Sequence, residues 1–197
     1  MLEMNEIVEL FARGMATVDS THPVAINVRS KIPFQPGIGP HTERRTVDLV
    51  TATFPEHISL DLEIPYPESA RSKCDVVIRS PDVWSIEIKM LRLMGDNGKP
   101  NDNILMHILS PYQKHRSAVT DVAKLLGSSL PGRKGIVIYG YDYEGWPMDP
   151  AIEAFEVLVK SGFRLSNRFE SSTGSLIHPV HQCGRVFGWE LIEVATA

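Results

Sequence analysis

KCDVVIRSPDVWSIEIKM, residues 73–90, is the stretch that decides the predicted fold. It contains two runs rich in Val, Ile and Trp, joined by the turn-forming residues Ser80, Pro81 and Asp82, and this pattern is typical of a β-hairpin. With Pro81 at the tip, the predicted pairs are Arg79 with Val83, Ile78 with Trp84, Val76 with Ile86, and Cys74 with Ile88. Because all but the first of these pairs are apolar, they predict a buried face of a sheet.

The opposite face of the hairpin is mostly polar, because side chains alternate along a strand with a period of two. Its members are Asp75, Val77, Ser85, Glu87 and Lys89. In the predicted register Asp75 lies directly across from Glu87, with Cβ atoms roughly 4.5–5.5 Å apart, where like charges destabilise a sheet. A divalent cation between them removes that cost, and Mg²⁺ suits the pair because it prefers oxygen ligands. Lys89 projects from the same face, within reach of what the metal holds.

The E-x-K triplet that contains Glu87 and Lys89 has a second explanation. An ordinary amphipathic strand also places such residues on its solvated side, and the triplet alone has little specificity. Asp75 adds to it, because it is predicted on the same face with eleven residues between it and Glu87. A metal-binding carboxylate pair and a solvated acidic face both remain open.

Asp75 followed by VVI, and then Ile86-Glu87-Ile88-Lys89, resembles the core motif of the PD-(D/E)xK, or restriction-endonuclease-like, nuclease superfamily. The resemblance implies that Asp75 and Glu87 bind metal, that Lys89 is catalytic, and that the backbone carbonyl of Ile88 is an additional metal ligand. The literal Pro-Asp dipeptide of the family name falls in the predicted turn, at residues 81–82. Cys74 precedes Asp75, so the match departs from the family motif at that position.

A helix is predicted over residues 42–54, and its narrow apolar stripe consists of Val47, Val50 and Phe54. Glu43 lies on that stripe, four residues before Val47, so it points toward the sheet. Glu43 could complement the helix dipole, or it could complete the metal site, since the resembling superfamily often places a Glu on the helix before the sheet. Two basic neighbours could contact phosphates or simply be solvated: Arg44 and Arg45.

Alternating apolar residues predict a strand over residues 58–64 that is broken at Pro65. Its polar face carries Asp61 and Glu63, either of which could replace Glu43 as the additional carboxylate. Residues 134–141, KGIVIYGY, are typical of a strand buried on both faces. The strand, helix, strand order leading to them predicts a crossover connection.

The next predicted helix covers residues 110–126, with Ser110 as its N-cap. Gln113 completes a capping box with Ser110, but in several branches of the resembling superfamily a polar helix here touches the metal site, so both roles stay open. The polar run 95–103 is either a mobile loop over substrate or an ordinary exposed loop. Three basic residues are weak candidates for phosphate contacts: Lys99, Lys114 and Arg116.

The C-terminal part, residues 149–197, is predicted to form a helix over 149–160 and strands over 163–169 and 186–194. Phe187, Trp189 and Leu191 share a face of the last strand. Between these strands His178, His181 and Cys183 have the spacing H-x₂-H-x-C. Without a second pair of ligands nearby in the sequence, this spacing is poor evidence for zinc.

Composition limits the class of protein. With 197 residues, 43% of them hydrophobic, the chain can bury a substantial core as one domain. The net charge of −4 gives no global attraction for nucleic acid, so a local basic cluster, a homodimer or a partner subunit has to supply it. Two cysteines indicate a reducing compartment. No apolar run approaches about 18 residues, and we expect a cytoplasmic protein without a membrane segment or export signal.

Taken together, the sequence predicts an α/β fold with a central mixed sheet flanked by helices. The resemblance implies a restriction-endonuclease-like core over about residues 42–141, and metal-dependent phosphodiester hydrolysis, most simply of DNA, with Mg²⁺ or Mn²⁺. Two alternatives remain. One is a non-catalytic module that keeps the fold and binds nucleic acid or protein, and the other is a scaffold whose acidic face is solvated.

Overall fold

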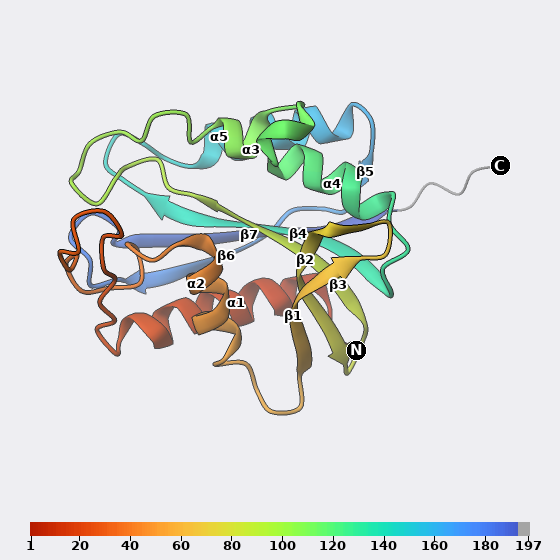
Figure 1. The fold of residues 1–197 in the computed structure, drawn as a ribbon, viewed down its shortest axis with the longest axis horizontal. Coiled ribbons are helices and arrows are strands. Elements are labelled where there is room, and N and C mark those ends of the chain that lie inside the picture. The colour runs from red at the N-terminus through yellow and green to blue at the C-terminus, as the bar shows by residue number, and fades with distance from the viewer. Residues whose placement is uncertain (193–197) are drawn as a thin grey trace.

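A mixed β-sheet lies at the centre of the molecule, between two layers of helices (Figure 1). The computed structural model describes residues 1–192. Within them the sheet has seven strands in the order β1-β2-β3-β4-β7-β5, with β6 also paired to β7. The strands are β1 (Ser59–Tyr66), β2 (Ser69–Ser80), β3 (Trp84–Leu91), β4 (Arg133–Asp142), β5 (Arg164–Leu165), β6 (Phe169–Ser175) and β7 (Cys183–Ile192). The predicted α/β class with a mixed sheet is confirmed.

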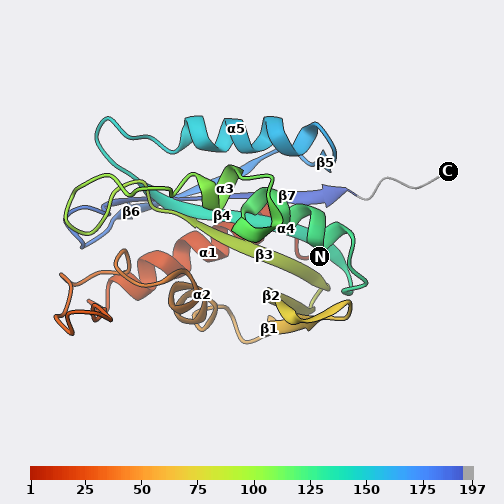
Figure 2. The ribbon, with the colours of Figure 1, turned by 45° about the horizontal axis from the view of Figure 1, so that its top comes forward.

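The two helix layers cover opposite faces of the sheet, as Figure 2 shows. One layer contains α1 (Met4–Asp19) and α2 (Glu43–Thr51), and the other contains α3 (Met106–Leu109), α4 (Ala118–Leu126) and α5 (Asp149–Lys160). A short 3-10 turn, η1 (Gln113–His115), precedes α4. Each face buries its own apolar cluster. No helix within the described part of the chain is long and apolar enough to cross a bilayer.

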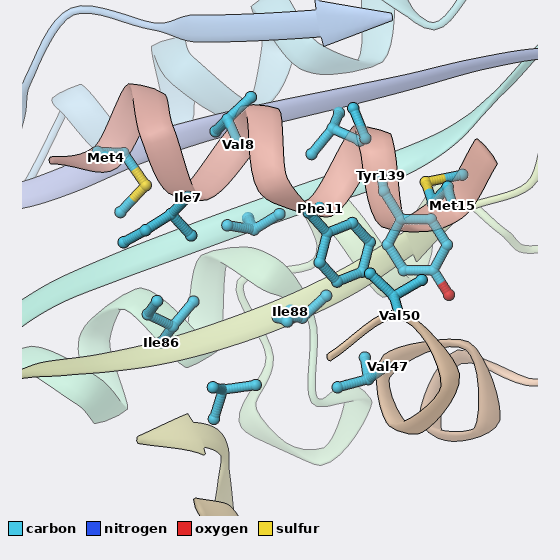
Figure 3. Packing of buried hydrophobic residues seen from close by; sticks show 14 of the residues in the cluster. Met4, Ile7, Val8, Phe11, Met15, Val47, Val50, Ile86, Ile88 and Tyr139 are labelled. Carbon is cyan, nitrogen blue, oxygen red and sulfur yellow. The ribbon is translucent and has the colours of Figure 1, made fainter. Parts of the chain in front are cut away.

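The first layer is held to the sheet by an apolar stripe along α1. Figure 3 shows this stripe, whose members are Met4, Ile7, Val8, Phe11 and Met15, packed with Ile86 and Ile88 of β3 and Tyr139 of β4. The helix itself lies against β6 and β7. The rings of Phe11 and Tyr139 lie 5.2 Å apart between centroids. Val18 extends the buried stripe by another turn, so the helix continues to Asp19.

The predicted hairpin is present as β2 and β3, and its register is confirmed. Three consecutive pairs join the strands: Val76 with Ile86, Val77 with Ser85, and Ile78 with Trp84. Pro81 and Asp82 lie in the turn, as expected. Asp82 accepts a hydrogen bond from the backbone of Leu2, so the literal Pro-Asp dipeptide lies outside the polar face of the hairpin.

The β2–β3 ladder ends at Val76, and the predicted pair of Cys74 with Ile88 is wrong. Opposite this point in β1, Glu63 has a φ of 53°, in the left-handed region. A left-handed residue interrupts the alternation of side chains along a strand. In β1 the alternation changes between Leu62, on the side of α1, and Ile64, on the side of α4. In β2 it changes at the same place, because Val76 belongs to the cluster under α1 and Cys74 to the cluster on the side of α4.

Strand β4 pairs in parallel with β3, and the connection between them contains α4, as the strand, helix, strand order predicts. Ile136 and Ile138 are buried toward α4 and α5, whereas Val137 and Tyr139 are buried toward α1. The prediction of a strand buried on both faces is confirmed.

The helix predicted over residues 110–126 is correct only in its second half. Arg116 has a φ of 47°, a left-handed conformation through which an α-helix cannot continue. Ser117 is the N-cap, because its side chain accepts a hydrogen bond from Thr120 N. Ser110 Oγ instead lies 2.6 Å from His115 Nδ1. The capping-box explanation of Gln113 is therefore wrong.

Two other element boundaries differ from prediction. β1 continues through Pro65, which an edge strand tolerates because it needs no N–H on its free side. The strand predicted over residues 163–169 is divided between the two-residue β5 and the start of β6. β7 is confirmed, and its shared face consists of Phe187, Trp189 and Leu191. Its predicted extension to residue 194 lies outside the described residues.

The packing of α1 on the sheet leads to a stability prediction. Replacing Phe11 with Ala is expected to lower the free energy of unfolding by about 3–5 kcal/mol, since it leaves a cavity against Tyr139. Urea denaturation followed by circular dichroism measures the change. Arg13→Ala, at an exposed position of the same helix, is the control and is expected to stay within about 0.5 kcal/mol of wild type. Equal effects of the two substitutions would contradict this account of the core.

Candidate active site

The candidate site lies where β2 and β3 part. Beyond the last pair of their ladder, the backbone N–H groups of Ile88 and Met90 are bound by side chains instead of a strand. Asp75 Oδ2 accepts from Ile88 N at 2.7 Å, and Glu43 Oε2 accepts from Met90 N at 2.6 Å. The prediction that Glu43 points toward the sheet is confirmed. Two carboxylates from distant parts of the sequence therefore meet on one strand edge.

Glu87 projects from β3 toward α4 and is 1% exposed. The hydroxyl of Tyr66 donates a hydrogen bond to Glu87 Oε1, and Lys124 Nζ lies 2.8 Å from the same oxygen. The interpretation of this face as solvated is therefore wrong, because α4 packs over it.

Helix α4 adds two residues that the sequence analysis does not predict, Asp121 and Lys124. Asp121 is buried, with Oδ2 2.7 Å from Lys89 Nζ and Oδ1 2.7 Å from Lys124 Nζ. Lys89 Nζ also lies 3.8 Å from Glu43 Oε1. Lys89 is thus held between the carboxylates of two helices, one from each layer.

The sequence contains a pattern that could have identified Asp121. Once α4 begins at Ala118, Asp121 falls on its buried stripe, whose apolar members are Ala118, Val122 and Leu125. A carboxylate on an apolar stripe is the same feature that identified Glu43. Placing the helix start at Ser110 hid this relation. Tyr66 lies past the predicted end of its strand, so no pattern identified it.

We call the inner group of charges the acid cluster; it consists of Glu43, Asp75, Glu87, Asp121, Lys89 and Lys124. Four carboxylates and two ammonium groups carry a net charge of −2 when all are ionised. Burial raises the pKa of Glu87 well above its usual range, and the charges of Asp75 and Asp121 raise it further. Burial also raises the pKa of Glu43. The acid cluster therefore holds protons unusually tightly, and a divalent cation would balance its excess negative charge.

Lys89 keeps its proton in this setting. Burial by itself would lower the pKa of Lys89, but the carboxylates of Glu43 and Asp121 outweigh it and hold the pKa above its ordinary value. An ammonium group that keeps its proton is suited to stabilising negative charge and not to abstracting a proton.

The acid cluster opens into a cavity of about 980 Å³. Its outer lining is basic and polar, and includes Arg71, Lys73, Gln113, Lys114, His115 and Arg116. Gln113, Lys114 and Arg116 are exposed on the turn that separates α3 from α4. A negatively charged floor with cations around the mouth is the arrangement that a phosphate with its metal counter-ion requires.

Three basic residues predicted as phosphate contacts lie outside the cavity: Arg44, Arg45 and Lys99. Arg44 forms an ion pair with Glu63, which also binds Lys73 at 3.0 Å. Because two cations neutralise Glu63, Glu43 is the better additional carboxylate. Arg45 and Lys99 are exposed and do not line the cavity.

The donor set suits Mg²⁺ or Mn²⁺, because the three predicted ligand side chains all offer carboxylate oxygens. The N–H and C=O of one strand residue point to the same side, so the carbonyl of Ile88 also faces the opening beside Asp75. In the described part of the chain, however, no three of these carboxylates bring oxygens within 4.8 Å of one another. Lys124 lies between Glu87 and Asp121. An ion held by three of these carboxylates at once would therefore need Lys124 to withdraw and the carboxylates to move closer together.

Comparison with protein-family models, with curated proteins and with solved structures found no match to this chain.

The raised pKa of Glu87 makes stability depend on pH. The folded-state pKa lies above the unfolded one, so this carboxyl contributes most to stability below about pH 4.5, and the contribution is lost as pH rises toward the folded pKa. Each unit of difference is worth about 1.4 kcal/mol. Glu87→Gln, which stays neutral, is expected to raise Tm at pH 8 in chelator and to leave it nearly unchanged at pH 4. Thermal unfolding across this range measures the effect.

The control for this experiment is Glu9→Gln, an exposed carboxylate on α1, which is expected to leave Tm unchanged at both pH values. A lower Tm for Glu87→Gln at pH 8 would mean that the ion pair with Lys124 stabilises the fold outright, and would contradict the account of an electrostatically costly site.

Proposed function

We propose that this protein is a metal-dependent phosphodiesterase with a restriction-endonuclease-like core, and that its substrate is nucleic acid, with DNA as the first choice. The observation that carries the proposal is the convergence of Asp75, Glu87 and Lys89 with Glu43 where two strands part. The resemblance of the sequence motif supports the same activity. The cavity supplies space for a backbone phosphate above these residues.

Glu43, Asp75, Glu87 and the carbonyl of Ile88 would hold Mg²⁺ or Mn²⁺. When bound, such an ion polarises the phosphate and lowers the pKa of the attacking water. Lys89, which stays protonated, stabilises the charge that builds on the phosphate oxygens. Asp121 orients Lys89 through their 2.7 Å ion pair.

Residues at the mouth of the cavity bind the flanking chain. Lys114 and Arg116 contact backbone phosphates, because they are exposed and lie on the same side of the cavity. Gln113, beside them in η1, donates to a phosphate oxygen or to an ordered water. These few cations give modest affinity for a protein with a net charge of −4, so a second copy or a partner subunit would extend the contact surface.

A second candidate function is favoured by Lys124. Its ammonium bridges Glu87 and Asp121 at 2.8 and 2.7 Å, which is how a cation can substitute for a metal ion in a site that has lost catalysis. In that case the protein is a binding module that keeps the fold. Such a module binds nucleic acid or a protein without divalent ions and does not cleave.

Cleavage of supercoiled DNA, linear DNA and RNA in Mg²⁺ or Mn²⁺ distinguishes the two functions. Wild type is expected to cleave one of these substrates. Glu87→Gln and Lys89→Met are expected to lose at least about 100-fold in rate, because the first removes a metal ligand and the second removes the charge that stabilises the reacting phosphate. Gel electrophoresis of the products measures the rate and shows whether the cuts are internal or terminal.

Asp82→Asn is the matched control, since it changes the literal Pro-Asp dipeptide outside the site and is expected to retain wild-type activity. Nucleic-acid binding by wild type without cleavage in either metal would favour the binding module. Equal cleavage by wild type, Glu87→Gln and Lys89→Met would rule out this site as the catalytic centre.

A further inference from the structure

Three loops meet beyond the end of β3: residues 37–41, 92–101 and 176–182. The buried carboxylate of Asp19, at the end of α1, joins the first and third loops by accepting hydrogen bonds from Ile38 N at 2.8 Å and Ile177 N at 2.7 Å. Arg92 Nη1 donates to Gly39 O at 2.8 Å and joins the first and second. None of these residues lines the cavity of the candidate active site.

Asp96, His178 and His181 come together at this junction. Each offers one ligand atom, and the three atoms lie within 4.8 Å of one another; no other such group of three occurs within residues 1–192. Both histidines are only 1% exposed, and the side chain of Asp96 is 18% exposed. Two loops that are far apart in sequence therefore present two imidazoles and a carboxylate to one point.

The imidazole of His181 is oriented for ligation. Its Nε2 lies 3.1 Å from the carbonyl oxygen of Met94, and because a carbonyl can only accept, Nε2 carries the proton. Nδ1 therefore has a free lone pair, and it is buried without a hydrogen-bond partner. A backbone carbonyl that fixes the tautomer of a histidine is the usual support of a metal-binding imidazole.

His178 also has an unpaired buried ring nitrogen, but this one is a donor: Nδ1 accepts a hydrogen bond from Val180 N, so Nε2 carries the proton. Its Nε2 is buried without a hydrogen-bond partner, and its ring stacks on that of His181 with centroids 4.7 Å apart. The ring of Tyr141 also packs against His181, with ring centroids 4.9 Å apart, and its buried hydroxyl has no hydrogen-bond partner. Leaving a buried polar atom without a partner is costly, so several such atoms around one point indicate that a bound species belongs there.

A charged histidine does not resolve this deficiency. Asp96 Oδ1 lies 3.7 Å from His181 Nδ1, a distance that would suit an ion pair if His181 were protonated. Both rings are only 1% exposed, and such burial disfavours a charged imidazolium. Neutral imidazoles are the form that binds metal ions.

We infer that Asp96, His178 and His181 form a binding site for a divalent transition-metal ion of the zinc type, separate from the candidate active site. Two imidazole nitrogens and one carboxylate suit Zn²⁺ and its neighbours in the first transition row, whereas Mg²⁺ prefers oxygen ligands. A water molecule takes the fourth position. Bound there, the ion links the loops 92–101 and 176–182 and stabilises the fold.

The geometry also sets limits on the site. Cys183, the third residue of the H-x₂-H-x-C spacing, is exposed at the start of β7 and is not part of the cluster. Ligation through His178 Nε2 moves the proton to Nδ1 and breaks the 3.3 Å hydrogen bond from Val180 N. Arg92, 3.4 Å from Asp96 Oδ1, offsets part of the carboxylate charge. Both features weaken the affinity without removing a ligand.

Zinc titration of chelator-treated protein tests the inference. Calorimetry is expected to show one Zn²⁺ per chain at this site, with a rise in Tm on binding and a loss of that rise after chelation. X-ray absorption of the zinc-loaded protein is expected to show imidazole nitrogens in the first coordination shell. Glu87→Gln is expected to retain this binding, which separates it from any ion held by the acid cluster.

Asp96→Asn and His181→Gln are expected to weaken zinc binding by at least about 10-fold. Asp96→Asn keeps the shape of a partly exposed side chain, so it reports on ligation even if the buried histidine variant fails to fold. The matched control is Asp102→Asn, an exposed carboxylate after the same loop, which is expected to bind zinc as wild type does. Absence of stoichiometric zinc, a first shell of oxygens alone, or unchanged binding by Asp96→Asn would overturn the inference and leave buried water as the occupant.

Discussion

The candidate site depends on one interruption in the sheet. The β2–β3 ladder ends at the pair of Val76 with Ile86. Beyond it, the N–H groups of β3 that have no partner in β2 donate to carboxylates from β2 and α2. A backbone donor left unpaired in such a place would be costly. The same hydrogen bonds that satisfy the strand edge therefore fix Asp75 and Glu43 beside Glu87. These two hydrogen bonds therefore stabilise the fold and also position the proposed metal ligands.

The buried carboxylates of this site carry an electrostatic cost to the stability of the fold. Asp75, Glu87 and Asp121 are close enough that burial and mutual repulsion raise the pKa of Glu87, while two lysines offset only part of the negative charge. A fold selected for stability alone would replace these groups with apolar ones of similar volume. A site that binds a cation and a phosphate has a physical reason to keep them.

Sequence patterns predicted those parts of the structure that local periodicity determines. The hairpin register, the doubly buried β4 and the inward direction of Glu43 follow from alternation or helical spacing. Cys74 could not be placed, because β1 and β2 change face together between Leu62 and Ile64 and between Val76 and Cys74, and strict alternation along the sequence does not indicate this change. Asp121 was missed because Ser110 and Ser117 both resemble N-caps, and tertiary packing decides between them.

The central proposal is that the acid cluster binds a divalent metal ion, and that Lys124 withdraws from Glu87 when the ion binds. Crystals soaked in Mn²⁺, with data collected at a wavelength where manganese scatters anomalously, test this most directly. The account predicts an anomalous peak in contact with Asp75 and Glu87, with the ammonium of Lys124 withdrawn from Glu87. An acid cluster that shows no anomalous peak at saturating Mn²⁺, with Lys124 still bound to Glu87, would contradict the account.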